Sequence, residues 1–544
     1  MQGIQSAPGT PVVAVVKHFD ANNAEGNNIN ARSTMDSVVN DRTLHEIYQP
    51  PFAAAVTQGH AGGVMCAINQ VNGQYACQNP TIETTDLRGQ MGFKGFVVSD
   101  IFSVHSTVPA LDAGTDQELF FPNQYSVPNL TAALNAGQIT AAQIRTAAFR
   151  YLSTMFRLGI FDTQLPATPA AVVSTPGHVS TALRMAEEGS VLLKDQGNIL
   201  PLSGSGKTIA VIGPTAAKDV SAMNACAGGV GGPSIDCSAL VDPLTALEAR
   251  AAQAGDTVVY DNGADPATAA AVAAKTDYAI VFGYYAESEG NDHVGLNLDN
   301  KGDALISAVA AANPDTAVVL NTGSPVLMPW LSSVKAVLEN WYGGQQMGPA
   351  LAALLFGDAN PSGKLPYTFP TSLSSTPTAS TAQYPGIVDS NGIYQMSYSE
   401  GLKVGYRWYT AQGVTPLFPF GFGLSYTSFQ ERLLGVEPDG GGATVTVAVR
   451  NTGARAGAQV VEVYVKDPAA SDEPSQQLKG FQRVTVPAGG MTVVRIHLNS
   501  RAFAVWDTPS QQWQVRPGTY QVMLGQDESH IIAQAPLYLR GNAR

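Results

Sequence analysis

Asp100 is the residue of this sequence best placed to carry out chemistry. It follows the apolar run Phe96-Val97-Val98-Ser99, which is typical of a buried β-strand. In an α/β barrel the catalytic side chains gather at the C-terminal ends of such strands, where they point into a pocket instead of a packed core. An Asp in this place can also simply cap the next segment. Asp100 is therefore a candidate nucleophile, and its neighbours must decide between the two interpretations.

Polar residues also end two apolar runs upstream of Asp100. Lys17 and His18 follow the first run, and Asn69 comes shortly after the second. Both runs are typical of buried parallel strands; they cover residues 12–16 and 63–65. Because the ends of parallel strands meet at one edge of a sheet, we expect the side chains of Lys17, His18, Asn69 and Asp100 to line a single pocket mouth.

The elements that position these residues alternate between strand and helix. The first two strands are separated by a helical pattern over residues 43–56, interrupted at Pro50-Pro51. After a linker rich in Thr, Pro and Ala, strand-like runs alternate with Ala-rich helical segments, which predicts a second, mostly parallel sheet. These runs are 209–213, 258–260, 278–282, 317–320 and 336–338. From about residue 428, short alternating strands predict a β-sandwich.

The length of 544 residues suffices for about three to four domains. We place a barrel-type domain with the nucleophile at 1–165, an α/β sandwich domain at 166–383, a connector at 384–427 and a β-sandwich at 428–544. The fold class is therefore α/β multidomain.

Composition limits the partners. A net charge of −13 argues against nucleic acid and anionic membrane surfaces, whereas neutral sugars remain compatible. The longest apolar stretches have the length of strands, so we expect no membrane-spanning segment. The first residues, MQGIQSAPGT, show no basic region followed by an apolar region, so export cannot be inferred from them.

The four cysteines form two local pairs, Cys66 with Cys77 and Cys226 with Cys237. Disulfides would suit a periplasmic or secreted protein, and a cytoplasmic location stays open because four buried thiols are the alternative. No CxxC spacing accompanies the cysteines, so we predict no zinc site.

Several motifs in this order resemble glycoside hydrolase family 3, the β-glucosidase family. They are VVAVVKHF, DSVVNDRTLHEIYQPPF, VMCAINQVNGQYACQNP, GFKGFVVSDIFSVHS, LFGDANPSGKLPYTFP and LFPFGFGLSYTSF, and they extend from about residue 10 to residue 430. The resemblance implies a (β/α)8-type barrel, a six-stranded α/β sandwich and a fibronectin type III-like domain.

The resemblance also implies a retaining mechanism with two carboxyl groups about 5–5.5 Å apart. Asp100 would be the nucleophile. The acid/base would lie in the run Tyr285-Ala286-Glu287-Ser288-Glu289-Gly290, which follows a strand of the second domain. Some family members match at Glu287 and others at Glu289, immediately before Gly; we favour Glu287 and keep Glu289 as the alternative. Asp292-His293 stands where relatives often have Asp-Arg.

By the same resemblance Lys17 and His18 would bind sugar hydroxyls, Arg32 would brace them or the nucleophile, and Met65 would form the floor of the sugar site. Each has a plainer interpretation, since a strand His is usually a satisfied polar group and a strand Met is usually core. Relatives usually have Trp where this chain has Ile101, so an aromatic platform is lost, and Phe102 or Tyr284 would have to replace it.

The barrel is predicted to be incomplete. A (β/α)8 barrel takes typically about 250 residues, whereas only about 160 precede the linker, and the first strands of the family barrel have no counterpart here. An open sheet would expose edges and apolar faces. Either a second subunit covers them or helices rearrange around them, and we favour a homodimer.

We therefore expect a retaining exo-acting β-glucosidase that needs no cofactor and no metal. The alternatives are a β-xylosidase of the same family, because pocket walls decide whether a hydroxymethyl group fits, and a catalytically degenerate carbohydrate-binding protein.

Overall fold

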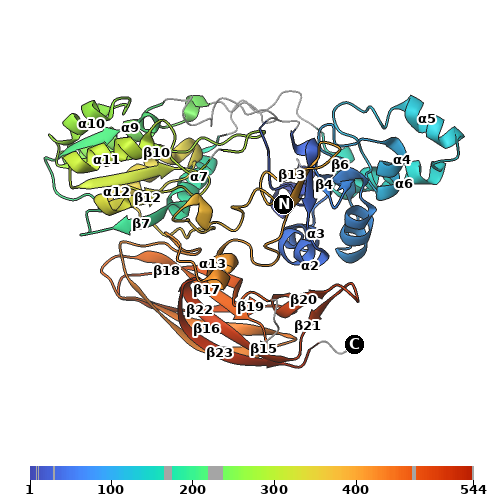
Figure 1. Ribbon diagram of the computed structural model, residues 1–544. Coiled ribbons are helices and arrows are strands. Elements are labelled where there is room, and N and C mark those ends of the chain that lie inside the picture. Colours follow the sequence, from blue (N-terminus) through green and yellow to red (C-terminus); the bar gives the residue numbers. More distant parts are fainter. Residues whose placement is uncertain are drawn as a thin grey trace.

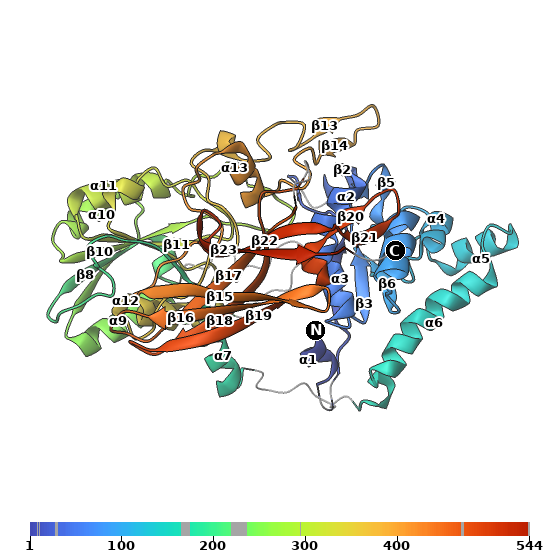
Figure 2. The same cartoon turned by 90° about the horizontal axis from the view of Figure 1, so that it is seen from below.

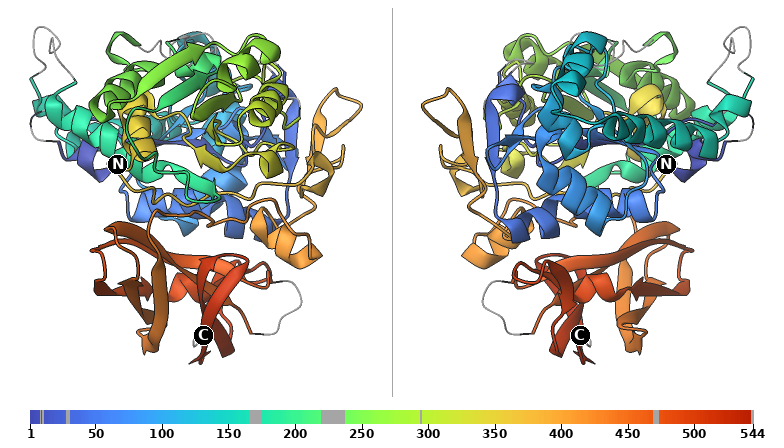
Figure 3. Two further views of the ribbon diagram at one scale, coloured as in Figure 1. Left: turned by 90° about the vertical axis from the view of Figure 1, so that its left-hand side faces the viewer. Right: turned by 90° about the vertical axis from the view of Figure 1, so that its right-hand side faces the viewer.

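Three bodies make up the protein in this computed structural model (Figure 1). The structure describes residues 1–7, 9, 11–27, 31–164, 174–218, 237–293, 295–468 and 473–541. The barrel-domain segment and the α/β domain lie side by side, and the β-sandwich lies below both in the views of Figures 1 and 3. The predicted boundary at 165/166 falls outside the described residues.

The barrel-domain segment contains a parallel sheet of order β1-β3-β6, formed by β1 (Val15–Phe19), β3 (Gly63–Cys66) and β6 (Phe96–Ser99). Its core is made of buried strand residues such as Phe19, Val64 and Val97. The accompanying helices are α1 (Gln2–Gln5), α2 (Asp41–Thr43), a π-helix (Leu44–Tyr48), α3 (Pro50–Thr57), a second π-helix (Thr81–Gln90), α4 (Thr107–Ala113), α5 (Val127–Asn135) and α6 (Ala141–Arg157). The predicted interruption at Pro50 is confirmed, because α3 starts there with proline in its first turn.

A complete (β/α)8 barrel has about eight parallel strands, and the described part of residues 1–164 joins three of them in one sheet. Large apolar side chains on α6 are exposed, among them Phe149 and Phe156. The incomplete barrel stays a prediction.

A second sheet ties the connector to the barrel-domain segment. Its order is β13-β14-β2-β4-β5, with β2 (Met35–Val38), β4 (Gln70–Val71), β5 (Gln74–Tyr75), β13 (Ile387–Val388) and β14 (Tyr394–Ser397). β14 pairs with β2 in parallel, from Tyr394 opposite Met35 to Ser397 opposite Val38. Figure 2 shows β13 and β14 beside the blue strands. The segment predicted as a connector thus adds two strands to a domain that lies far away in sequence.

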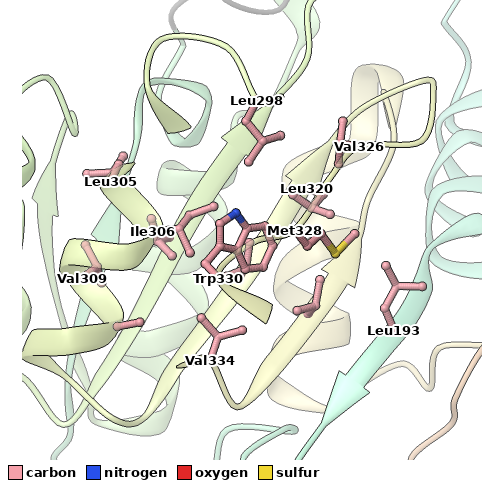
Figure 4. Close-up of a cluster of buried hydrophobic side chains, with 14 of the residues drawn as sticks. Leu193, Leu298, Leu305, Ile306, Val309, Leu320, Val326, Met328, Trp330 and Val334 are labelled. Carbon is pink, nitrogen blue, oxygen red and sulfur yellow. The ribbon is translucent and has the colours of Figure 1, made fainter. Parts of the chain in front are cut away.

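The α/β domain has the six-stranded sheet that the resemblance implies. Its order is β7-β12-β11-β10-β8-β9, all parallel except β7 at one edge. The strands are β7 (Val191–Asp195), β8 (Thr208–Ile212), β9 (Thr257–Asp261), β10 (Tyr278–Tyr284), β11 (Thr316–Asn321) and β12 (Ala336–Glu339), and the helices are α7 (Pro176–Gly189), α9 (Pro243–Ala254), α10 (Pro266–Ala273), α11 (Gly302–Ala312) and α12 (Met347–Phe356). Figure 4 shows Trp330 at the centre of one of its two cores.

The C-terminal body is the predicted β-sandwich. One sheet has the order β15-β16-β19 and the other β18-β17-β22-β23. The strands are β15 (Phe429–Asp439), β16 (Gly442–Asn451), β17 (Gly457–Lys466), β18 (Gln477–Val486), β19 (Met491–Leu498), β22 (Gly518–Asp527) and β23 (His530–Leu539), preceded by α13 (Tyr406–Gln412). A hairpin of β20 (Ala504–Asp507) and β21 (Gln512–Val515) reaches the barrel-domain segment, where Trp506 stacks on His45 with ring centroids 3.8 Å apart.

One predicted disulfide is confirmed. Cys66 at the end of β3 and Cys77 are bonded, and both are fully buried. Cys226 lies outside the described residues, so the second predicted pair is not described.

Candidate active site

Asp100 stands where the sequence places it, directly after β6. Its backbone N–H donates to the carbonyl of Cys66 at 3.2 Å, which fixes the residue to the end of the neighbouring strand β3. Its Oδ1 accepts a hydrogen bond from the backbone N–H of Ile101 at 2.7 Å. The side chain is 13% exposed, so the carboxylate is largely withdrawn from water and can still be reached.

His18 of β1 faces Asp100 across the strand that separates them. Its Nε2 lies 3.2 Å from Asp100 Oδ2. Burial opposes ionisation of Asp100, but His18, the N–H of Ile101 and the charge of Arg32 outweigh it, so that the pKa of Asp100 lies below its usual value of 3.8. The site therefore holds this carboxylate in the ionised form that a nucleophile requires.

Arg32 links the barrel-domain segment to the second domain. The side chain is only 1% exposed, and its Nη2 lies 3.0 Å from Oε1 of Glu289. Its Nε lies 3.4 Å from Oε2 of Glu25. A buried guanidinium needs such partners, because an unpaired charge in the interior is costly. Arg32 thus brings Glu289 into the electrostatic neighbourhood of Asp100.

The loop after β10 supplies Glu289, and residues before and after Glu289 bind to the α/β domain. The His293 ring stacks on Tyr285 with centroids 3.7 Å apart, and His293 Nε2 lies 3.0 Å from Asp299 Oδ1. The backbone N–H of Ala286 donates to Asp299 Oδ2 at 2.7 Å. His293 therefore braces the loop from within the α/β domain.

Glu287 has different partners from Glu289. Its carboxylate accepts hydrogen bonds from the hydroxyls of Ser324 and Tyr342, the latter at 3.1 Å. It also lies against Gly323, where a Cβ would collide with Glu287 Oε2. These partners belong to the α/β domain, whereas Glu289 contacts the barrel-domain segment.

The remaining predicted residues lie on the same strands. Lys17 is exposed on β1, and no hydrogen bond or ion pair is found for it within the described ranges. Met65 is half-buried on β3, opposite Val98 of β6. The structure therefore brings His18 to Asp100 and Arg32 to Glu289, and leaves Glu287 among side chains of its own domain.

Exposed aromatic rings lie beside Asp100 in the chain. Phe102 is 60% exposed with φ 57°, and it stacks on Phe121, which is 63% exposed, with centroids 6.1 Å apart. The segment before Phe121 is tied to β6, because Leu119 N–H donates to the hydroxyl of Ser99 at 3.0 Å. A positive φ is unfavourable for an aromatic residue.

Two contributors escaped the sequence analysis, Glu25 and Tyr384. Glu25 Oε2 accepts the backbone N–H of Gly290 at 2.9 Å, and the Tyr384 hydroxyl donates to Asp292 Oδ2 at 2.8 Å. A weak signal for Glu25 was its place in the Asn-rich loop before Arg32. Tyr384 gave none, because it is about ninety positions from its partner.

Potential metal ligands gather at the disulfide. Within the described residues, the close group of potential ligands is Cys66, Cys77 and Glu83, whose two sulfurs are bonded to each other and so offer no thiolate. No helix in the described part of the chain has the length and apolar character needed to cross a membrane.

Comparisons with known proteins identify the family of this chain. The family model "Glycosyl hydrolase family 3 N terminal domain" matches residues 1–154, "Glycosyl hydrolase family 3 C-terminal domain" matches 190–426, and "Fibronectin type III-like domain" matches 459–528. The chain is 37% identical to thermostable β-glucosidase B of Acetivibrio thermocellus, over 98% of this chain and 69% of that protein. It is 33% identical to an exo-α-(1→6)-L-arabinopyranosidase of Bifidobacterium breve, over 100% of this chain and 71% of that protein.

A similar solved structure is DesR, a β-glucosidase from Streptomyces venezuelae in complex with D-glucose. The TM-score is 0.87 at 31% identity, covering 98% of this chain and 82% of that one. β-D-Glucoside glucohydrolase from Trichoderma reesei gives the same TM-score of 0.87 at 30% identity, covering 99% of this chain and 80% of that one. Motifs, fold and relatives thus agree over nearly the whole chain, which belongs to glycosyl hydrolase family 3.

Proposed function

We propose that this chain is a retaining, exo-acting β-glucosidase that releases terminal β-D-glucosyl residues with Asp100 as the nucleophile. The main support is the setting of Asp100, a largely buried carboxylate at a strand end whose pKa is held below its usual value by His18, Ile101 N–H and Arg32 despite burial. The β-glucosidases among the relatives add independent support.

Glu289 is the acid/base that we propose, in place of the initially favoured Glu287. Its partner Arg32 also lowers the pKa of Asp100, so the charge of one guanidinium acts on both carboxyl groups. Glu287 is instead engaged by Ser324 and Tyr342 within the α/β domain. A catalytic acid must reach the bond that the nucleophile attacks, and these contacts favour Glu289.

The reaction follows as two displacements. A carboxylate oxygen of Asp100 bonds to the anomeric carbon while the bond to the leaving oxygen breaks, and the proton of Glu289 passes to that oxygen. Water then attacks the anomeric carbon, Glu289 accepts its proton, and the bond to Asp100 breaks. The configuration is retained after two inversions, and the scheme requires neither metal nor cofactor.

Sugar recognition is assigned to the side chains around this pair. His18 and Lys17 would donate hydrogen bonds to ring hydroxyls, Arg32 would brace the two carboxylates, and Met65 would lie beneath the sugar ring. His18 lies 3.2 Å from Asp100, and Met65 on β3 pairs with Val98 of the neighbouring strand β6, which supports this assignment.

The leaving group is proposed to lie against Phe102 and Phe121. Phe102 follows Asp100 by two residues, and the segment that carries Phe121 is hydrogen-bonded to Ser99 of β6 through Leu119. The two stacked, exposed rings would replace the aromatic platform lost at Ile101. Phe102→Ala is expected to raise KM for aryl glucosides with little change in kcat, because stacking is lost while the carboxylates stay in place. An unchanged KM would contradict this role.

The direct test is release of nitrophenol from nitrophenyl β-D-glucoside, β-D-xyloside and α-L-arabinopyranoside by the wild type and by Asp100→Asn. The third substrate is included because of the arabinopyranosidase relative. We expect cleavage of the glucoside and loss of at least about 10³-fold in kcat for Asp100→Asn. Preference for the xyloside would favour the β-xylosidase, and turnover of none would favour a degenerate sugar-binding protein.

Assembly and location are proposed on separate grounds. A homodimer would cover the exposed apolar side chains of α6, such as Phe149 and Phe156. Sedimentation at micromolar concentration is expected to give a dimer, and a well-behaved monomer would contradict it.

The Cys66–Cys77 disulfide supports a periplasmic or secreted location, where disulfides persist; detection in the cytoplasmic fraction of cells would contradict this location.

A further inference from the structure

Asp292 joins the acid/base loop to the barrel-domain segment through its side chain and its backbone. Its carboxylate accepts the backbone N–H of Glu25 at 3.1 Å and that of Gly26 at 2.7 Å. Its own N–H donates to the carbonyl of Gly26 at 2.6 Å. Three hydrogen bonds therefore hold one residue of the second domain to one turn of the first.

Tyr384 adds a third segment to this contact. Its hydroxyl donates to Asp292 Oδ2 at 2.8 Å. Tyr384 belongs to the connector, which is itself fixed to the barrel-domain segment by the pairing of β14 with β2 and by the hydroxyl of Tyr398, which donates to the carbonyl of Ala21 at 3.0 Å. The Tyr384 hydroxyl therefore links Asp292 to the barrel-domain segment, which carries Asp100.

Glu289 directly precedes a second contact of the same loop with the barrel-domain segment. Gly290, the next residue, donates its N–H to Oε2 of Glu25 at 2.9 Å, and Glu289 itself pairs with Arg32. Arg32 also lies 3.4 Å from Glu25. The backbone on the C-terminal side of Glu289 is therefore held at residues 290 and 292, while its carboxylate is held by Arg32.

We infer that Asp292 and Tyr384 are positioning residues that fix the acid/base Glu289 relative to Asp100; this inference rests on the proposed function. Neither touches the reacting atoms. They act on the loop that bears Glu289, so their loss displaces the proton donor and leaves the nucleophile, which is fixed by β6, Cys66 and Ile101, in place. Small displacements of a catalytic group are enough to slow a reaction strongly.

Leaving-group dependence separates this role from a merely structural one. A glucoside with a poor leaving group, such as phenyl β-glucoside, needs a proton from the acid during bond cleavage. 2,4-Dinitrophenyl β-glucoside departs without such help. A displaced acid therefore slows the first substrate far more than the second, whereas general unfolding or a damaged nucleophile slows both equally.

The experiment measures kcat/KM for both glucosides with Tyr384→Phe, Asp292→Ala and Asp292→Asn. Tyr394→Phe is the matched control, because Tyr394 lies on the same connector and no hydrogen bond of its hydroxyl is found within the described ranges. Melting temperatures of all variants are measured in parallel. Asp292→Asn keeps one acceptor oxygen for the backbone donors and tests for conservative rescue.

We expect the phenyl glucoside to lose about tenfold or more in kcat/KM with Tyr384→Phe, more with Asp292→Ala, and an intermediate amount with Asp292→Asn. The dinitrophenyl glucoside should change within about twofold, and Tyr394→Phe should behave as wild type. Equal losses on both glucosides, or no loss on either, with an active wild type would overturn the positioning role alone. A wild type that cleaves neither glucoside would overturn the proposed function and this role with it.

Discussion

Arg32 and Glu289 form an ion pair at 3.0 Å although 257 positions separate them in the sequence. The pair joins a buried guanidinium of the barrel-domain segment to a carboxylate of the α/β domain, and the charge of Arg32 also lowers the pKa of Asp100. The relative position of the two domains is therefore part of the site, because neither domain alone contains both carboxyl groups of the proposed reaction.

Replacing Arg32 should damage both stability and catalysis. Arg32→Ala leaves Glu25 and Glu289 without their common cation, and since both carboxylates are partly exposed we expect a loss of about 2 kcal/mol in the free energy of unfolding. We expect kcat to fall about a hundredfold, because Glu289 loses its support. Thermal unfolding and steady-state kinetics measure the two effects. An unchanged kcat in a folded variant would contradict the role of Arg32.

The acid/base assignment is tested by azide rescue of Glu289→Ala and Glu287→Ala. Azide is a nucleophile that needs no general base, so it restores the second step only in the variant that lacks the true acid/base. With dinitrophenyl β-glucoside we expect rescue of Glu289→Ala, with glucosyl azide as product. Rescue of Glu287→Ala instead would return the assignment to the residue initially favoured.

Removing His18 should move the acidic limb of the pH profile. His18 is the largest of the influences that lower the pKa of Asp100, and burial alone raises it. Asp100 attacks only when ionised, so activity falls as pH drops through its pKa. With His18→Ala we expect the acidic limb of kcat/KM for dinitrophenyl β-glucoside to shift to higher pH. His18→Gln, which keeps an N–H donor, should shift less, and an unmoved limb in both would refute the contact.

Glu83 should make the protein less stable as pH rises, whereas a carboxyl group with a lowered pKa makes it less stable as pH falls. Burial raises its pKa from 4.5 to about 8, so the folded protein keeps a proton that the unfolded chain has lost between these values. Stability therefore falls as pH rises through this window, by an amount on the order of 3 kcal/mol at pH 7.

Glu83→Gln keeps an acceptor for the Thr115 hydroxyl and removes the titration. We expect the wild type to lose more melting temperature than this variant between pH 5 and pH 8. Parallel losses in both proteins would show that Glu83 is not protonated in the folded state.

Local patterns in the sequence were sufficient for the elements that bear the site. The run before Asp100 became β6, the prolines at 50–51 began α3, and the apolar runs of the second domain became its parallel strands. The antiparallel edge strand β7 and the pairing of β14 with β2 were not predicted, because both depend on partners far away in sequence. Short polar strands such as β14 give no hydrophobic periodicity to detect.

The site was predictable up to the point where two domains meet. Glu287 and Glu289 are two residues apart in one polar loop, and nothing local distinguishes their carboxylates. The distinction comes from Arg32 on one side and from Ser324 and Tyr342 on the other, which are tertiary contacts. The family resemblance supplied both candidates because some family members match at Glu287 and others at Glu289, and for that reason it could not choose between them.

In the proposed reaction Asp100 forms a covalent bond to the sugar. The most direct measurement is mass spectrometry of the wild type and Asp100→Asn after incubation with 2,4-dinitrophenyl 2-deoxy-2-fluoro-β-D-glucoside, which slows hydrolysis of a glycosyl-enzyme. We expect one fluoroglucosyl group on the wild-type peptide that contains Asp100, and none on the variant. A sugar attached to another carboxylate, or turnover of glucosides by Asp100→Asn at the wild-type rate, would contradict it.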